Sequence, residues 1–208
     1  MLKFRDMISH RIDTPKSRLA SIAYTELVDH AILRHFWTNV KEIDDGVFRS
    51  NHPTHARLKK FKEAGGAAVL NLRGVQVWAP VVLERESCRQ LGLEYIYLPM
   101  TSAQLPERKT VCDLVEILRT APRPLLMHCK SGADRTGLAA GIYMLAFKNA
   151  TPQAAAAQLS WRHAHNRFSD KAILRDFFTL YQPAYDAGQD FMDWVRNDYD
   201  PKQGKTAS

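Results

Sequence analysis

The sequence has few cysteines and no long hydrophobic segment, and both shortages narrow the classes of protein that it can encode. Its three cysteines are too few and too widely spaced for a disulfide framework or a four-cysteine zinc site. The longest uncharged apolar run in the second half of the chain, residues 136–147, is shorter than the roughly 20 residues that span a bilayer. The first 18 residues lack the apolar stretch of a signal peptide. We therefore expect a cytoplasmic protein without a transmembrane segment.

Internal repeats, low-complexity tracts and Gly/Ser-rich linkers are also missing, and 208 residues is the length of one domain. With 45% apolar and 25% charged residues, the composition is that of a globular protein. We predict a basic N-terminal segment with an amphipathic helix over residues 1–36, a main domain over residues 37–198 and a disordered tail over residues 199–208.

Positive charge is in excess and unevenly placed, with a formal net charge of +7. Residues 1–20 hold five basic and two acidic residues, and residues 49–73 hold six basic and one acidic residue. Such a surplus favours an anionic partner. No nucleic-acid-binding motif accompanies it, so we expect no nucleic-acid partner. We expect the apolar face of the N-terminal helix to pack on the domain, and peripheral membrane contact is the alternative.

Strand-like and helix-like segments alternate along the chain, which is typical of an α/β fold with a mainly parallel sheet. Two of the strand-like runs are continuously apolar, as expected of strands buried on both faces. The predicted strands cover residues 47–48, 67–72, 95–98 and 124–127. The predicted helices cover residues 18–36, 54–64, 80–91, 106–119, 136–147 and 152–159. A further helix is predicted to begin after its cap at Ser169, and Pro183 is expected to separate that helix from a last one over residues 185–195.

One segment, HCKSGADRTG at residues 128–137, lies between a predicted strand and a predicted helix. Such a loop points backbone N–H groups at one spot, where the helix dipole also favours an anion. Arg135 offers a planar fork that fits two phosphate oxygens, and Gly132 permits backbone geometry that a side chain would obstruct. Cys129 lies at the centre of this positive loop, which should lower its pKa. We predict a phosphate-binding loop in which the Cys129 thiolate is the nucleophile for phosphoryl transfer.

Neighbouring residues have supporting roles in this prediction. The Thr136 hydroxyl is expected to donate to the Cys129 sulfur, and the His128 ring is expected to hold the loop. Lys130 either adds positive charge for a highly anionic substrate or is a solvated lysine. The residues predicted to bind the phosphate group along the loop are Lys130, Ser131, Gly132 and Ala133.

This segment resembles the signature of the cysteine-dependent protein-tyrosine-phosphatase superfamily, His-Cys-x5-Arg-Ser/Thr. Upstream, DGVFRS at 45–50 with Pro53, and VLNLRG at 69–74, are similar to strands of bacterial and fungal dual-specificity-like phosphatases. The resemblance covers roughly residues 40–160. It implies a single α/β domain with a four- or five-stranded sheet flanked by helices. It also implies a phosphomonoester hydrolase with a phosphocysteine intermediate, no metal or other cofactor, and phosphotyrosine, phosphoserine or phosphothreonine proteins as substrates.

The proton donor departs from the family pattern. The family usually places an aspartate in a loop before the cysteine, but residues 97–111 contain none, and Glu107 is the only acid there. Asp134 lies beside Arg135, a position where myotubularin-like and Sac-like phosphoinositide phosphatases also carry aspartate. We predict that Asp134 protonates the leaving oxygen, with Glu107 as the alternative. A helix cap or an ion pair with Arg135 is the structural role open to Asp134.

The remaining conspicuous residues receive structural roles. We expect Cys88 and Cys112 to pack in the interior, with protection of Cys129 against oxidation as the alternative. Arg73 either faces the mouth of the site or forms a surface salt bridge. The aromatic residues expected in the core are Phe36, Trp37 and Trp161. We expect His52 and His55 to face solvent, with the substrate mouth as the alternative location. We expect His163 and His165 to be surface or packing residues.

Three other functions compete with a protein phosphatase. The basic helix at 56–63 and Lys130 favour a phosphoinositide or inositol phosphate substrate, and the charge of residues 49–73 would then steer it. A catalytically weak phosphate-binding pseudophosphatase is the second alternative. A rhodanese-type sulfurtransferase is the third, although its loop is one residue shorter and lacks the arginine pattern.

Overall fold

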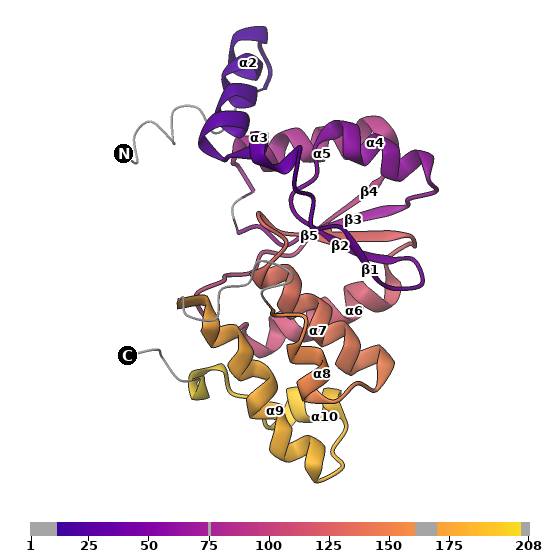
Figure 1. Ribbon diagram of the computed structural model, residues 1–208, viewed down its shortest axis with the longest axis vertical. Helices are drawn as coiled ribbons and strands as arrows, with labels where there is room; N and C mark the ends of the chain where they lie inside the picture. The colour runs from indigo at the N-terminus through magenta and orange to yellow at the C-terminus, as the bar shows by residue number, and fades with distance from the viewer. Residues whose placement is uncertain (1–11, 75, 161–169, 205–208) are drawn as a thin grey trace.

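A five-stranded sheet in the order β1-β2-β5-β3-β4 forms the centre of the fold (Figure 1). Neighbouring strands are parallel, except that β1 is antiparallel to β2. This confirms the predicted α/β fold with a mainly parallel sheet. The computed structural model describes residues 12–74, 76–160 and 170–204. The strands are β1 (Lys41–Asp44), β2 (Val47–Ser50), β3 (Ala68–Asn71), β4 (Glu94–Tyr97) and β5 (Leu125–His128).

The inner strands β3 and β5 are buried on both faces, as their continuous apolar sequences predict. Successive side chains of a strand point to opposite faces. Leu70 and Met127 accordingly pack in the larger core on one side of the sheet. Val69 and Leu126 pack in a smaller core on the other side.

Helices cover both faces of this sheet (Figure 1). Helices α4 (His55–Glu63) and α5 (Ala79–Leu91) cover one face, while α6 (Arg108–Thr120) and α7 (Asp134–Lys148) cover the other. Helices α8 (Pro152–Ala156), α9 (Asp176–Asp186) and α10 (Phe191–Asn197) pack beyond α7. None of the helices in the described ranges combines the length and the apolar character needed to cross a membrane.

The N-terminal segment differs from the single docked helix that was predicted. It forms α2 (Pro15–Ala23), a π-helical turn (Tyr24–Val28) and α3 (Ala31–Arg34), and the left-handed His30 separates the last two. The predicted apolar face is not buried, since Leu19 is 69% exposed and Phe36 is 90% exposed. Trp37 is also exposed in part rather than packed in the core, and Trp161 lies outside the described residues. The spacing of the apolar residues predicted a helix here, but it did not predict the π-helical turn or the interruption at His30.

The C-terminal region is more ordered than predicted. Pro183 lies inside α9 instead of separating two helices. The predicted disordered tail begins with Tyr199, which is buried and donates its hydroxyl hydrogen to the Pro106 carbonyl oxygen at 2.8 Å. A short 3-10 helix, Pro201–Gln203, follows it. The helix cap predicted at Ser169 lies outside the described residues, as do His163 and His165.

Candidate active site

The sheet brings three chain segments together at its carboxyl edge. Both Ser50 at the end of β2 and Asn71 at the end of β3 are in register with His128 at the end of β5. Cys129 therefore leaves the sheet at its centre, flanked by the segments that follow both neighbouring strands. The next residues form a loop that leads into α7, which begins at Asp134. Ligands of parallel α/β sheets bind at this edge.

The first two carbonyl groups of the loop are held away from its centre. The His128 Nδ1 atom lies 3.2 Å from the Cys129 carbonyl oxygen. Because a carbonyl oxygen can only accept, Nδ1 carries the hydrogen in this contact. The backbone N–H of His52 donates to the Lys130 carbonyl oxygen at 3.2 Å.

The next two carbonyl groups are held by residues that the sequence did not single out. Asn39 donates from Nδ2 to the Ser131 carbonyl oxygen at 3.2 Å. Arg49 donates from Nη2 to the Gly132 carbonyl oxygen at 2.7 Å, and its Nη1 is held by Gln158 at 2.8 Å. In a trans peptide the C=O and the following N–H point in opposite directions. The N–H groups of residues 130–133 therefore face the side where an anion would lie.

Only glycine fits the loop at position 132. Its φ is +74°, in the left-handed region, and a Cβ atom there would lie 2.6 Å from the carbonyl carbon and oxygen of Ser50. The same Cβ would lie 2.7 Å from the Asn51 backbone nitrogen. The close approach of the loop to the end of β2 thus requires glycine.

The groups around Cys129 lower the pKa of its thiol. Burial by itself raises the pKa of Cys129, but the Arg135 charge, the hydroxyl and N–H of Thr136 and the N–H of Gly132 together hold that pKa below its ordinary value. A thiol in this environment is deprotonated more readily, and the thiolate is the nucleophilic form. The Thr136 hydroxyl is thus one of the groups that act on the thiol, and its donation to the Cys129 sulfur stays a prediction.

Arg135 connects the loop to an open cavity of about 450 Å³. The Arg135 Nε–H is buried and has no hydrogen-bond partner among the described residues, so a donor is available beside the loop. Trp78, which the sequence reasoning missed, forms part of the wall. The cavity is lined by Gly74, Trp78, Pro99, Met100, Thr101, Ser102 and Arg135.

The two candidate proton donors lie in different places. Asp134 is buried in the first turn of α7, directly before Arg135. Glu107 is exposed where α6 begins. Burial raises the pKa of Tyr199, on the side of the C-terminal helices, and the Glu107 charge adds to this rise. The geometry therefore keeps Asp134 beside the loop and places Glu107 away from it.

Asp29, in the N-terminal segment, forms ion pairs with three cationic side chains. Its carboxylate lies 2.7 Å from Arg73, 2.8 Å from Arg34 and 3.3 Å from Lys130. Burial opposes its ionisation, but the hydrogen bond and charge of Arg73, with the charges of Arg34 and Lys130, lower the pKa of Asp29 to about 2. Arg73 is thus in a buried ion pair, neither at the site mouth nor in a surface salt bridge. Lys130 is half-exposed and ion-paired.

The basic stretch at 49–73 is not the exposed steering surface that was predicted. Three of its six cations are arginines with partners inside the protein, since Arg49 binds the loop, Arg57 donates to the Asn51 side chain at 2.5 Å, and Arg73 binds Asp29. The exposed remainder consists of the lysines of α4, next to Glu63.

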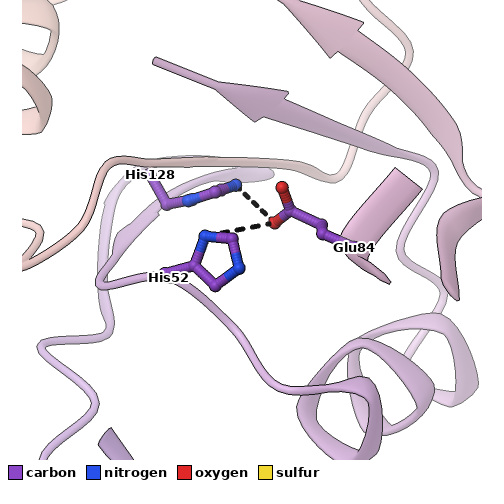
Figure 2. A group of neighbouring side chains, drawn as sticks. All are labelled: His52, Glu84 and His128. Carbon is purple, nitrogen blue, oxygen red and sulfur yellow. Dashed lines mark ion pairs between the residues drawn. The ribbon is translucent and has the colours of Figure 1, made fainter. Parts of the chain in front are cut away.

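A buried group of three side chains lies directly behind the loop (Figure 2). The Oε1 atom of Glu84 is 2.6 Å from His128 Nε2 and 3.9 Å from His52 Nδ1. His52 was expected at the surface or at the substrate mouth but is buried here, because the chain turns inward after β2. Burial, with the charge of Arg73, holds the pKa of His52 well below its usual range. His55, in contrast, is exposed as predicted.

The other two cysteines have packing roles. Cys88 is buried in the smaller core, and burial raises the pKa of its thiol to about 12. Cys112 is partly buried against the larger core. The burial and raised pKa of Cys88 argue against its redox alternative.

Known phosphatases resemble this chain in sequence and in fold. TpbA of Pseudomonas aeruginosa, a dual specificity protein phosphatase, is 28% identical over 173 residues, which make up 80% of this chain and 68% of TpbA. A structure of TpbA in complex with pTyr superposes with a TM-score of 0.55 at 18% identity, covering 71% of this chain and 96% of that one. The catalytic core of the PP-IP phosphatase Siw14 from S. cerevisiae gives a TM-score of 0.57 at 20% identity, covering 69% and 85%.

A family model extends the likeness to the residues of the site. The model described as "Polymorphic toxin system, DSP-PTPase phosphatase" matches residues 45–148, which is half of the chain. The matched segment starts just before β2 and ends with α7, so it contains four strands of the sheet and the whole loop from Cys129 to Arg135. The chain therefore belongs to this family of DSP-PTPase phosphatases.

Proposed function

We propose that this chain hydrolyses phosphomonoesters through a phosphocysteine intermediate on Cys129. The observation that carries the proposal is the loop itself, with four consecutive carbonyl groups hydrogen-bonded to the surrounding protein, a thiol of lowered pKa and a buried Arg135 Nε–H that has no partner among the described residues. This arrangement provides a nucleophile at the point where N–H donors converge, which suits a phosphoryl group.

The reaction proceeds in two displacements. The Cys129 Sγ atom attacks phosphorus, and the bond from phosphorus to the ester oxygen breaks as the S–P bond forms. The departing oxygen takes a proton and leaves as an alcohol. Water then attacks phosphorus and gives a proton back to the group that protonated the leaving oxygen, the S–P bond breaks, and inorganic phosphate leaves with the thiolate restored. Arg135 and the loop N–H groups hold the equatorial oxygens in both steps.

We assign the proton transfer to the leaving oxygen to Asp134. Its place next to Arg135 at the start of α7 supports this assignment over Glu107. Asp134→Asn should lower kcat by about 10²–10⁴-fold on an ester with a poor leaving group. The loss should be much smaller on an aryl phosphate whose leaving group departs without a proton. An equal loss on both esters would indicate that Asp134 supports the loop rather than donating the proton.

We propose phosphotyrosine in proteins as the principal substrate. The cavity at Arg135 has aromatic and apolar walls in Trp78, Pro99 and Met100, and Arg135 is the only cation among the described residues that line it. A flat aromatic ring packs well against such walls. A polyphosphorylated ring would need further cations, but Arg73 and Lys130 are paired with Asp29. TpbA binds pTyr, which fits this choice, while Siw14 acts on PP-IP.

The test is phosphate release from a phosphotyrosine peptide, a phosphoserine peptide, a phosphoinositide and a soluble inositol pyrophosphate. We expect the highest kcat/KM on phosphotyrosine and none with Cys129→Ser. Trp78→Ala should lower that value several-fold, while Trp37→Ala, outside the cavity, should not. Higher kcat/KM on an inositol phosphate would replace the proposed substrate. Binding of the peptide without phosphate release from any substrate would identify a pseudophosphatase.

A further inference from the structure

The buried group behind the loop has features of a metal site rather than of a simple hydrogen-bond network. Three polar atoms converge there, His52 Nδ1, Glu84 Oε1 and His128 Nε2, and all lie within 4.8 Å of one another (Figure 2). All three are buried. Glu84 Oε1 and His128 Nε2 form a close ion-pair contact of 2.6 Å, but none of the three atoms has a hydrogen bond of acceptable geometry within the described residues. Buried polar atoms normally have such a partner, so this convergence requires an explanation.

The other nitrogen of each ring fixes which atom faces the cluster. His128 Nδ1 donates to the Cys129 carbonyl oxygen, so a neutral ring presents an Nε2 lone pair to Glu84. His52 is hydrogen-bonded to the Pro80 backbone, and because its Nδ1 is unpartnered, that bond is made by Nε2. His52 therefore presents an Nδ1 lone pair. Two imidazole lone pairs and a carboxylate oxygen repel one another unless they share a proton or a metal ion.

The surroundings of the cluster match those of metal-binding histidines. Such histidines almost always donate their second ring N–H to a carbonyl or carboxylate, and here both donate to backbone carbonyl groups. The second oxygen of Glu84 accepts from Asn71 Nδ2 at 2.5 Å, which orients the carboxylate. Nearby Arg73 and Arg34 would disfavour a cation, but both are paired with Asp29.

Access to the cluster is available from the side of the N-terminal segment. A cavity of about 320 Å³ lies between α2, α4 and α5, and its lining includes His52, Pro80 and Glu84. A cavity of this size holds water molecules, which can complete the coordination of an ion. An ion could therefore reach the cluster without passing through the phosphate loop.

We propose that His52, Glu84 and His128 bind a divalent transition-metal ion, with Zn²⁺ as the expected ion. Two imidazole nitrogens and one carboxylate oxygen form a common zinc donor set, in which water takes the fourth position. The ion would connect the segment after β2, helix α5 and the end of β5 directly behind Cys129. This role is structural and separate from the proposed phosphoryl transfer.

The test uses the full chain with Cys129→Ser, so that the reactive thiol cannot serve as a ligand. After treatment with a chelator, the protein is titrated with Zn²⁺ by calorimetry and with Co²⁺ by visible absorption. We expect one ion per chain, the absorption of a low-coordinate Co²⁺ site and a higher Tm with Zn²⁺. Glu84→Gln and His52→Ala, made in the same background, should each weaken binding by at least about 10-fold. His55→Ala, which removes an exposed histidine nearby, should have no effect.

Several outcomes would overturn the proposal. One is the absence of stoichiometric binding by the folded Cys129→Ser chain, a result that needs no further variant. Another is binding that survives both Glu84→Gln and His52→Ala, which would assign the ion to other histidines. Loss of binding with His55→Ala would place the site on the surface. If His52→Ala does not fold, the test depends on the near-isosteric Glu84→Gln, whose folding is checked by circular dichroism. Unweakened binding by folded Glu84→Gln would then overturn the proposal.

Discussion

Replacing the Asp29 carboxylate should destabilise the protein in a way that depends on pH. Asp29 is buried and contacts Arg73 at 2.7 and 2.9 Å and Arg34 at 2.8 Å. Asp29→Asn keeps the shape of the side chain but leaves both guanidinium groups without a carboxylate partner. Breaking a buried ion pair in this manner typically costs about 3–5 kcal/mol.

The pKa of Asp29 sets the pH range of the effect. A carboxyl whose pKa falls from 3.8 to about 2 on folding contributes about 2.4 kcal/mol to the free energy of unfolding at pH 7. Because the pKa in the folded state is lowered, this contribution is complete above the unfolded value and is lost as the pH falls towards 2. About half of it should remain at pH 3.

The assay is urea unfolding followed by tryptophan fluorescence, at pH 7 and at pH 3. We expect Asp29→Asn to lower the free energy of unfolding by at least about 2 kcal/mol at pH 7, and by roughly half as much at pH 3. Asp13→Asn removes an exposed carboxylate of the same segment and should change stability by less than about 0.5 kcal/mol. A loss that is equal at both pH values, or no loss at all, would refute the ion-pair reasoning.

Three further predictions concern single residues. Gly132→Ala should lower kcat/KM by about 10²-fold or more, because the added Cβ displaces the loop. Gly188 also has a positive φ, but the space around it is open, so Gly188→Ala should leave kcat/KM unchanged. Equal kcat/KM values for the two variants would contradict the loop geometry. Tyr199→Phe should lower the free energy of unfolding by about 1 kcal/mol through the lost hydrogen bond to Pro106, and an unchanged urea midpoint would contradict this. Cys88 should resist iodoacetamide at pH 8 in the folded protein, and mass spectrometry that finds it modified as fast as Cys129 would contradict its burial.

The sheet and the loop were predictable because their signals are local and repetitive. The apolar runs around Val69 and Leu126 identify strands that are buried on both faces of the sheet. The order Cys129, Gly132, Arg135 after such a strand identifies an anion-binding loop. Strand β1, in contrast, is a polar edge strand, Lys41–Asp44, whose pairing depends on β2 and not on its own composition.

The groups that hold the loop from outside could not be predicted in the same way. Asn39 and Arg49 reach the loop from 92 and 83 residues away in the sequence, and nothing in their local pattern indicates a carbonyl partner. The signal that could have found Arg49 is its position at the end of a strand that pairs with the one before Cys129. His52 and Glu84 meet His128 only because the sheet and α5 bring them together.

The N-terminal segment was mispredicted because helical spacing reports periodicity and not burial. The residues that suggested an apolar face, among them Leu19, Leu27 and Ile32, are more than 40% exposed. The segment is held by polar contacts, which are the Asp29 ion pairs and the Arg18–Glu86 ion pair, and by two other apolar residues, Tyr24 and Ala31, which are buried. Nothing in the local sequence around Arg18 and Asp29 indicated that their side chains would form the ion pairs that hold this segment on the domain.

The pH dependence of Cys129 alkylation tests most directly whether the loop is a phosphate-binding site around a thiolate. The rate of iodoacetamide modification of Cys129 is followed by mass spectrometry across pH, with and without inorganic phosphate, and with a free thiol in the same buffers as reference. We predict a midpoint below that of the free thiol, because Arg135, Thr136 and the loop N–H groups outweigh burial. Phosphate should slow the modification. A midpoint at or above that of the free thiol, with no protection by phosphate, would contradict the account.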